Sequence, residues 1–250
     1  MSTHSRKAVI IGGTHGIGLA TAHLLLQHDT HVIVTGRSSQ PIDSLRDKAH
    51  LLPCDITSFD AITSLAEQTQ DLFGSGPQLD LVFINAGYAH LEPFTSVTSA
   101  TFRRTFDTNV FGAFFVAQKF APLVRDGGAI VFTTSVSNKT GIPGMAAYSA
   151  SKAAVQSLVL TLAAELASRK IRVNAVSPGF VDTPTMGVED ASAEARAAFE
   201  AEGPRTTPLG RVGVPEEVAK AVVFLAFDAT FSTGSEVVVD GGLAFLHTEK

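Results

Sequence analysis

Short apolar runs rich in β-forming residues alternate with longer helical patterns along nearly the whole chain, and this alternation restricts the possible folds most strongly. Strands that are apolar throughout and are each followed by a helix indicate a parallel sheet covered on both faces. We therefore expect one α/β domain with a doubly wound, seven-stranded, mostly parallel sheet. The expected strands are Ala8–Ile11, His31–Thr35, His50–Pro53, Leu81–Ile84, Ala129–Thr134, Ile171–Ala175 and Glu236–Val239. The expected helices are Gly16–Gln27, Ile42–Lys48, Phe59–Phe73, Ala100–Val124, Tyr148–Ser168 and Pro215–Leu225.

Composition argues against several other classes of protein. The 250 residues are 45% hydrophobic and 17% charged, which suits one domain with a sizeable core. A net charge of -5 without a Lys/Arg cluster argues against nucleic-acid binding, and no run of about 18 apolar residues indicates a membrane span. The one cysteine, Cys54, argues against disulfides and cysteine-based metal sites. We expect Cys54 to be a small core residue and the protein to be cytoplasmic.

The first expected strand ends in a glycine-rich turn, GGTHGIG, which leads directly into a helix. Gly12 permits a tight turn, Gly16 lets the backbone approach a pyrophosphate, and Gly18 lets the helix pack on the sheet. The helix N-terminus offers unpaired N–H groups and the positive end of its dipole to phosphates. This turn predicts a nucleotide site, although a glycine-rich turn without a ligand has the same spacing. The cofactor contacts expected here are Gly12, Thr14, His15, Gly16, Ile17 and Gly18.

The end of the second expected strand distinguishes between the two nicotinamide dinucleotides. An NAD site usually places a carboxylate about 20 residues beyond the glycines, on the ribose hydroxyls, but here the segment VTGRSS carries Arg37 instead. A guanidinium there would pair with a 2′-phosphate, which a carboxylate would repel. We therefore expect NADP(H) rather than NAD(H); the alternative is that Arg37 only solvates a loop.

Two further strand ends carry residues for the same ligand. After the third expected strand, Asp55 would bond the adenine amino group or cap the following helix, and Ile56 would pack on the adenine ring. After the fourth, the segment NAG supplies Asn85, Ala86 and Gly87, of which Asn85 would bond neighbouring backbone and Gly87 would let the chain pass close to a ribose. A plain turn would also use these three residues. Ligands of such sheets bind beyond the carboxyl ends of the strands, where all these residues meet.

The helix after the fifth expected strand carries the candidate chemistry. Tyr148 and Lys152 lie four residues apart in the segment YSASK, and hence on one face of the helix. That face continues through Val155 and Val159, so we expect both polar side chains to point inward over the edge of the sheet. The alternative is a purely structural contact between the two side chains.

An inward tyrosine beside a lysine suits a proton donor. A free phenol has a pKa near 10, and an ammonium at about 4 Å, in an effective dielectric of about 20, would lower that pKa by as much as about 3 units. Ser135, at the end of the fifth strand, would orient the substrate oxygen, and a bound dinucleotide would supply the hydride. Three other hydroxyl residues compete for the role of Ser135, namely Thr133, Thr134 and Ser137.

Together these segments resemble the short-chain dehydrogenase/reductase family in its ordinary-length form. The resemblance runs from about Lys7 to Gly242 and rests on the glycine turn, CDI, NAG, NVFG, YSASK, RVNAVSPGFVDT and the closing DGG. The family's enoyl reductases space the lysine differently and its longer epimerase-type members alter the glycine turn, so neither subclass is expected. The resemblance implies a Rossmann-type domain and an NADP(H)-dependent oxidoreductase that reduces a ketone or aldehyde to an alcohol, or catalyses the reverse reaction.

The family pattern implies a role for each matching residue. Tyr148 would be the general acid and base, Lys152 would bond the nicotinamide ribose and lower the pKa of Tyr148, and Ser135 would orient the substrate oxygen. Asn109, in NVFG, would hold a water that links Lys152 to solvent. From the sequence alone, a packing or helix-kinking role for Asn109 is also open.

The segment SPGFVDTP, after the sixth expected strand, would line the nicotinamide by the same resemblance. Pro178 and Gly179 would pack on the ring, and the backbone of Val181 and the hydroxyl of Thr183 would bond its carboxamide. The chain departs from the family pattern at Ile11, where the family usually has threonine before the first glycine. This change removes a hydroxyl that would stabilise the turn.

Residues 185–208 lie where the family has a mobile lid over the substrate. The segment ASAEARAAFEAE predicts a helix, and Met186 and Phe199 would present apolar surface to a fairly apolar carbonyl or alcohol substrate. Ser137 is a further expected substrate contact. Closure of the lid would exclude water from the reaction.

The expected helix Ala100–Val124 carries phenylalanines on nearly every side, so we expect a partner subunit to cover what one sheet face cannot bury. Family members are commonly tetramers or dimers, and the resemblance implies a homotetramer before a dimer.

Two functions from other classes stay open. One is a lyase or isomerase that uses Tyr148 as a base. The other is a nucleotide-sensing regulator without turnover, which we would expect to lose Tyr148 or Lys152, whereas this chain has both.

Overall fold

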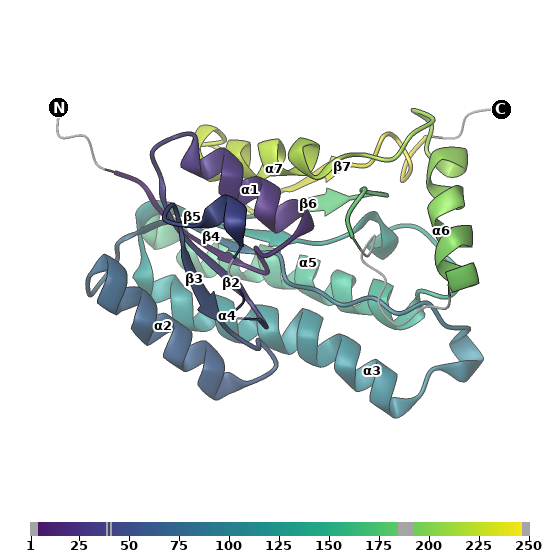
Figure 1. The fold of residues 1–250 in the computed structure, drawn as a ribbon, viewed down its shortest axis with the longest axis horizontal. Coiled ribbons are helices and arrows are strands. Elements are labelled where there is room, and N and C mark those ends of the chain that lie inside the picture. The colour runs from purple at the N-terminus through teal and green to yellow at the C-terminus, as the bar shows by residue number, and fades with distance from the viewer. Residues whose placement is uncertain (1–4, 39, 41, 185–192, 247–250) are drawn as a thin grey trace.

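The computed structural model describes residues 5–38, 40, 42–184 and 193–246, and these form a central sheet with helices on both faces (Figure 1). Seven strands pair in the order β3-β2-β1-β4-β5-β6-β7, and every pairing is parallel. The expected doubly wound sheet is therefore confirmed, although β5 begins earlier than expected. The strands are β1 (Lys7–Ile11), β2 (His31–Gly36), β3 (His50–Pro53), β4 (Leu79–Ile84), β5 (Val124–Thr133), β6 (Arg172–Pro178) and β7 (Glu236–Val239).

The helices divide between the two faces of the sheet. Helices α1 and α7 pack together on one face, α2, α4 and α5 cover the other, and α6 stands beside the carboxyl ends of the strands (Figure 1). The helices are α1 (Gly16–Leu26), α2 (Phe59–Phe73), α3 (Ser99–Phe106), α4 (Ala113–Phe120), α5 (Ala146–Leu166), α6 (Ala193–Thr206) and α7 (Pro215–Val223). Short 3-10 turns span Asp43–Leu45, Phe94–Ser96, Ala121–Leu123, Val136–Asn138 and Ala167–Arg169, and π-helical turns span Asp107–Gly112 and Phe224–Asp228.

Two apolar cores explain why the strands are apolar throughout. Successive side chains of a strand point to opposite faces. In β1, Val9 and Ile11 enter the core beneath α2, α4 and α5, whereas Ala8 and Ile10 enter the core beneath α1 and α7. The central strands are thus buried from both sides, and their polar side chains gather at the strand ends.

Two of the expected helices are wrong in their extent. The segment Ile42–Lys48 forms only a 3-10 turn, because Asp47 takes a left-handed conformation (φ 61°) that a helix does not continue through. The segment Ala100–Val124 is divided into α3, a π-helical turn, α4, a 3-10 turn that contains Pro122, and the first residue of β5. A π-helical turn adds a residue to the helix, and such turns are frequent at functional sites.

The inward stripe expected on α5 is confirmed. Lys152, Val155 and Val159 are buried on this helix. The helix expected within residues 185–208 is present as α6, while residues 185–192 of that segment lie outside the described part of the chain. None of the described helices is long and apolar enough to cross a membrane.

Candidate active site

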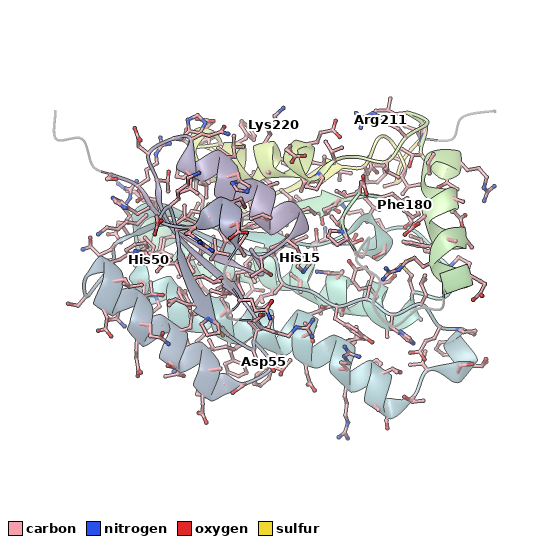
Figure 2. The ribbon with its side chains drawn as sticks, viewed as in Figure 1. His15, His50, Asp55, Phe180, Arg211 and Lys220 are labelled. Carbon is pink, nitrogen blue, oxygen red and sulfur yellow. The ribbon has the colours of Figure 1, made fainter. Side chains whose placement is uncertain are left out.

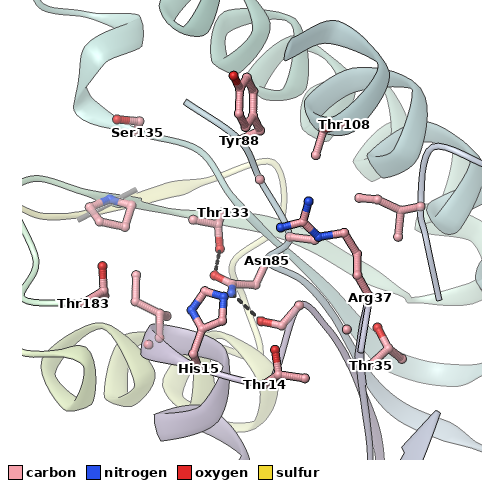
Figure 3. Close-up of a pocket in the computed structure, with 18 of the residues that line it drawn as sticks. Thr14, His15, Thr35, Arg37, Asn85, Tyr88, Thr108, Thr133, Ser135 and Thr183 are labelled. Carbon is pink, nitrogen blue, oxygen red and sulfur yellow. Dashed lines mark hydrogen bonds between the residues drawn. The ribbon is translucent and has the colours of Figure 1, made fainter. Parts of the chain in front are cut away.

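A cleft of about 400 Å³ runs along the carboxyl edge of the sheet and brings nearly all the expected site residues together (Figure 3). We call it the cleft. Gly18 and Asn109 are the expected residues that lie behind its wall rather than in it. The expected residues that line the cleft are Gly12, Thr14, His15, Gly16, Ile17, Arg37, Asp55, Ile56, Asn85, Ala86, Gly87, Ser135, Tyr148, Lys152, Pro178, Gly179, Val181 and Thr183.

The turn between β1 and α1 leaves no room for side chains. Gly12 has a positive φ of 79°, and a Cβ there would lie 2.6 Å from the Cα of Ala86. A Cβ on Gly18 would lie 2.1 Å from the carbonyl oxygen of Gly12. The glycines therefore let α1 begin directly against the turn, with its N-terminal N–H groups facing the cleft.

The turn at Ile11, where the family usually has threonine, is held by backbone hydrogen bonds. The carbonyl oxygen of Ile11 accepts from the N–H groups of Asn85 (2.9 Å) and Ala86 (2.8 Å). The Asn85 side chain donates to the Gly12 carbonyl (2.8 Å) and accepts from the hydroxyl of Thr133 (2.9 Å), as Figure 3 shows. Asn85 thereby ties together the ends of β1, β4 and β5, so this amide is structural.

Three further features of the cleft fit a phosphorylated dinucleotide. The hydroxyl of Thr35 is buried and has no hydrogen-bond partner, although this residue lines the cleft. The exposed guanidinium of Arg37 extends into the cleft (Figure 3). His15 is the N-cap of α1 and makes no side-chain capping bond. Donors, a positive charge and a bare helix N-terminus are what a dinucleotide phosphate requires.

Asp55 does not cap the following helix. Ser58 is the N-cap of α2 and accepts from the N–H of Ala61. Asp55 instead accepts from the N–H (3.0 Å) and hydroxyl (2.8 Å) of Thr57, and these bonds lower its pKa. The helix-cap alternative is therefore wrong. The neighbouring Cys54 is buried and burial raises its pKa to about 11, which confirms it as a core residue rather than a reactive thiol.

Tyr148 and Lys152 line the same side of the cleft. Lys152 is 3% exposed, and its Nζ donates to the Thr133 carbonyl at 2.8 Å. The same Nζ lies 5.7 Å from the centre of the Tyr148 ring. Burial lowers the pKa of Lys152 to about 8. The ammonium is thus held beside the phenol by a strand carbonyl rather than by the phenol oxygen itself.

The expected lowering of the Tyr148 pKa is wrong for this structure. Burial raises the pKa of Tyr148 above 10.0, and a hydrogen bond with Ser135 lowers it only in part. The expectation assumed an ammonium at salt-bridge distance from the hydroxyl, whereas Lys152 is directed to Thr133. Desolvation of the phenolate is the larger effect here.

The four hydroxyl residues at the end of β5 differ in their hydrogen-bond partners. Ser135 is the one that hydrogen-bonds Tyr148. Thr133 donates to Asn85, and Thr134 donates to the Val176 carbonyl and to Glu236. Ser137 is buried and its hydroxyl has no partner. These partners distinguish Ser135 from the other three hydroxyl residues as the one beside Tyr148, a distinction that the sequence alone did not give.

Asn109 occupies the π-helical turn between α3 and α4 and is 1% exposed. Its Oδ1 accepts from the N–H of Tyr88 (2.7 Å), and its Nδ2 donates to the Tyr88 carbonyl (2.8 Å) and to Ser151 (2.9 Å). A Cβ on Gly87 would lie 3.3 Å from Lys152 Nζ and 3.5 Å from Asn109 Oδ1, so the ammonium and the amide are neighbours. Asn109 thus fixes the backbone after β4 against α5.

A second, smaller cavity of about 70 Å³ continues from the cleft, and we call it the side cavity. It shares Ser135, Tyr148 and Gly179 with the cleft. The rings of Phe180 and Phe199 meet at 4.9 Å on its wall, where Phe180 faces α6 (Figure 2). The other lining residues are Ala89, Val136, Ser137, Ile142, Met145 and Leu243. Met186, an expected substrate contact, lies outside the described residues.

Sequence reasoning missed several residues of both spaces. Tyr88, Arg104 and Thr108 line the cleft, and the guanidinium of Arg104 lies 4.0 Å from the centre of the Tyr88 ring. The sequence offered a signal for each of them. Tyr88 directly follows the segment NAG, and Arg104 and Thr108 are four residues apart, a spacing that places two side chains on one face of a helix. No periodicity marks Met145 or Phe180.

Within the described part of the chain, no cluster of His, Cys, Asp or Glu could hold a metal ion.

Comparison with known proteins gives consistent relatives across the whole chain. The family model described as enoyl-(acyl carrier protein) reductase matches residues 12–244. The 3-oxoacyl-(acyl-carrier-protein) reductase FabG of Thermotoga maritima is 35% identical, over 97% of this chain and 99% of that protein. Cyclopentanol dehydrogenase of a Comamonas species is also 35% identical, over 96% and 97% of the two chains. A solved short chain dehydrogenase/reductase family protein superposes with a TM-score of 0.84 at 34% identity, over 98% of this chain and all of that one.

Proposed function

Because this chain belongs to the short-chain dehydrogenase/reductase family, we propose that it is an NADP(H)-dependent oxidoreductase that reduces a ketone or aldehyde to an alcohol, or catalyses the reverse reaction. One observation carries the proposal. The hydroxyl of Tyr148, bonded to Ser135, stands where the cleft and the apolar side cavity meet. A carbonyl group placed there would contact both hydroxyls and would also face the cleft.

The proposed roles follow from the groups around Tyr148. When bound, the dinucleotide supplies the hydride. Tyr148 donates a proton to the substrate oxygen, and its raised pKa keeps the phenol protonated at neutral pH. Ser135 hydrogen-bonds the same oxygen and orients it. The ammonium of Lys152, 5.7 Å from the ring centre, stabilises the negative charge that develops on Tyr148.

Proton supply to this pair is assigned to Asn109. The amide and the Lys152 ammonium are neighbours beside Gly87, and Lys152 lines the cleft. We assign Asn109 the role of holding a water that links Lys152 to solvent as a proton relay. Its bonds to Tyr88 keep this part of the wall in place.

NADP(H) is the proposed dinucleotide because of the charge at the end of β2. Arg37 extends into the cleft next to the turn that carries Thr14 and His15 (Figure 3). A guanidinium favours a 2′-phosphate, and no acidic residue stands beside it in the segment VTGRSS. Asp55 and Ile56 would meet the adenine, while Pro178, Gly179, Val181 and Thr183 would meet the nicotinamide.

Carbonyl reduction is favoured over enoyl reduction, which the description of the matching family model names. Tyr148 and Lys152 are four residues apart, and a hydroxyl from Ser135 stands beside the phenol. This trio suits a carbonyl oxygen. It also argues against a regulator without turnover, for which a buried Tyr–Lys pair would have no use.

The test is consumption of NADPH with a panel of ketones. We expect purified protein to oxidise NADPH only when a ketone is present, and to reduce NADP⁺ with the corresponding alcohol. Product analysis by mass spectrometry separates the alternatives, because a lyase or isomerase would change the substrate without net consumption of NADPH.

The proposal includes a lid and an assembly. Residues 185–208 form the proposed lid, of which α6 places Phe199 on the wall of the side cavity. Phe102 on α3 and Phe114 on α4 are each 43% exposed. Phe102 stacks on Phe106 and Phe114 meets Phe115 edge to face, which supports coverage of this surface in a homotetramer or, second, a dimer. A monomeric mass by light scattering at micromolar concentration would contradict the assembly.

A further inference from the structure

The side cavity contains one unsatisfied hydrogen-bonding group. Ser137 lines it and is 3% exposed, and its Oγ is shielded from solvent without a hydrogen-bond partner. Buried hydroxyls in proteins nearly always have a partner, and a lone one lowers stability. An unpaired hydroxyl beside a cavity that adjoins Tyr148 therefore indicates a group that arrives with a ligand.

The residues next to Ser137 show why it has no partner within the chain. Thr134, Asn138 and Lys139 all donate to the carboxylate of Glu236, which is 7% exposed on β7. Gln156 on α5 donates to the same carboxylate. This carboxylate fixes the segment 134–139 on both sides of Ser137.

The backbone of the turn is also engaged. The N–H of Ser137 donates to the Oγ of Ser135 (3.2 Å), and the N–H of Asn138 donates to the Ser135 carbonyl (3.1 Å). These bonds fix the backbone of Ser137 against Ser135, and the hydroxyl of Ser137 is left without a partner in the turn. A ligand oxygen is the partner that this arrangement leaves open.

The remaining lining restricts the charge and size of that ligand. None of the described residues around the side cavity carries a charge, and its walls include Met145, Ile142 and the paired rings of Phe180 and Phe199. An ionised group would lose its hydration there without compensation. The cavity, at about 70 Å³, is small beside the cleft of about 400 Å³.

We propose that the side cavity selects a compact, neutral ketone that carries a second oxygen on a carbon adjacent to the carbonyl or one carbon further, and that Ser137 donates a hydrogen bond to this oxygen. The proposal rests on the carbonyl reductase function given above. The spacing follows from the turn, since Ser135 and Ser137 are two residues apart and the Ser137 N–H bonds the Ser135 hydroxyl. The carbonyl would bind Ser135 and Tyr148, and the second oxygen would bind Ser137.

A pair of ketones of equal size tests the proposal. The substrates are 2-methoxycyclohexanone and 2-ethylcyclohexanone, which differ by one ether oxygen in place of a methylene. We expect the full-length protein to reduce the methoxy ketone with a kcat/KM roughly tenfold higher, the size of one buried hydrogen bond. Ser137→Ala should remove this preference by lowering kcat/KM for the methoxy ketone to about that for the ethyl ketone.

Thr140→Val is the matched control. This hydroxyl donates to the Val136 carbonyl in the same turn but does not line the side cavity, so the variant should retain the preference. Loss of the preference in Thr140→Val as well would mean that the turn, not the Ser137 hydroxyl, sets it, and this would overturn the proposal.

The remaining outcomes separate this inference from the general function. Equal rates for both ketones in wild type, unchanged in Ser137→Ala, would overturn the inference and leave the reductase intact. If neither ketone is reduced, calorimetric titration of each ketone into the NADPH-saturated protein decides. If the methoxy ketone binds more tightly and Ser137→Ala removes this difference in Kd, the selectivity of the side cavity is upheld and the proposed reduction is overturned. If the two ketones bind equally, both the selectivity and the proposed reduction are overturned.

Discussion

The cleft and the side cavity meet at Ser135 and Tyr148, yet they are built in opposite ways. The cleft is large, and its walls come from the ends of consecutive parallel strands, fixed by backbone hydrogen bonds such as those from Asn85 and Ala86 to Ile11. The side cavity is small and apolar, and its walls come from loops and from α6. The shape of the cleft is therefore set by the sheet, whereas that of the side cavity depends on segments outside the sheet.

Replacement of Tyr148, which lies where the cleft and the side cavity meet, should have the largest effect on turnover. Tyr148→Phe keeps the ring but removes the proton donor, so we expect kcat to fall by roughly 10²–10⁴ while the Kd for NADPH, measured by fluorescence, stays nearly constant. Ser157→Ala, which removes an exposed hydroxyl from the outer side of the same helix, should have no effect. Undiminished turnover of Tyr148→Phe would contradict the proposed chemistry.

A methyl group at Gly18 should disrupt the cleft alone. Its Cβ would meet the Gly12 carbonyl oxygen at 2.1 Å, so Gly18→Ala should lower the free energy of unfolding by about 3 kcal/mol, measured by urea denaturation, and weaken NADPH binding. Gly141→Ala is the control, because a Cβ there has no atom within 4 Å. Equal stability of the two variants would mean that the glycine turn is looser than described.

The charge at Arg37 should set the choice of dinucleotide without altering the side cavity. Arg37→Ala should reduce the ratio of kcat/KM for NADPH to that for NADH roughly 10–100-fold, because a charge-assisted bond to the 2′-phosphate is lost. KM for the ketone should not change. Arg46→Ala, which removes an exposed arginine paired with Asp43 outside the cleft, serves as the control. An NADH preference in wild type that survives Arg37→Ala would refute the assignment.

Lys152 should give a diagnostic pH dependence of stability. Burial lowers its pKa to about 8 from 10.5, so between these values the unfolded chain binds more protons than the folded protein. Stability from this group therefore rises as pH increases through that window and is lost as pH falls through about 8, by at most about 1.4 kcal/mol per pH unit. Lys152→Met should remove this contribution, and the surface variant Lys48→Met should not. Identical pH profiles for wild type and Lys152→Met would show that the ammonium is not desolvated.

The cleft could be predicted from sequence because the topology of the sheet determines which residues line it. Parallel strands bring their carboxyl ends to one edge, so residues directly after apolar runs, such as Gly12, Asp55 and Asn85, had to meet. The π-helical turn could not be predicted. Its residue Asn109 bonds the backbone of Tyr88, and local sequence does not show such a contact between distant segments. The same holds for the pKa of Tyr148, which depends on burial and on the direction of a lysine.

Most residues that line the side cavity could not be predicted from the sequence. Phe199 was expected there because the lid lies over the substrate in the family, but Met145 and Phe180 sit in segments without periodicity. Ser137 was expected as a substrate contact, but its lack of a partner appears only when Glu236 is seen to take the bonds of its neighbours. Loops that fold onto the carboxyl edge of the sheet carry specificity that local sequence patterns do not encode.

Transfer of deuterium from cofactor to product tests the central claim most directly. The reaction would use NADPH that carries deuterium in place of both hydrogens on the reactive nicotinamide carbon, with a ketone that the protein accepts. The account predicts an alcohol with one deuterium on its carbinol carbon, detected by mass spectrometry, and almost none from Tyr148→Phe in the same time. An alcohol without deuterium, or equal labelling by the variant, would contradict it.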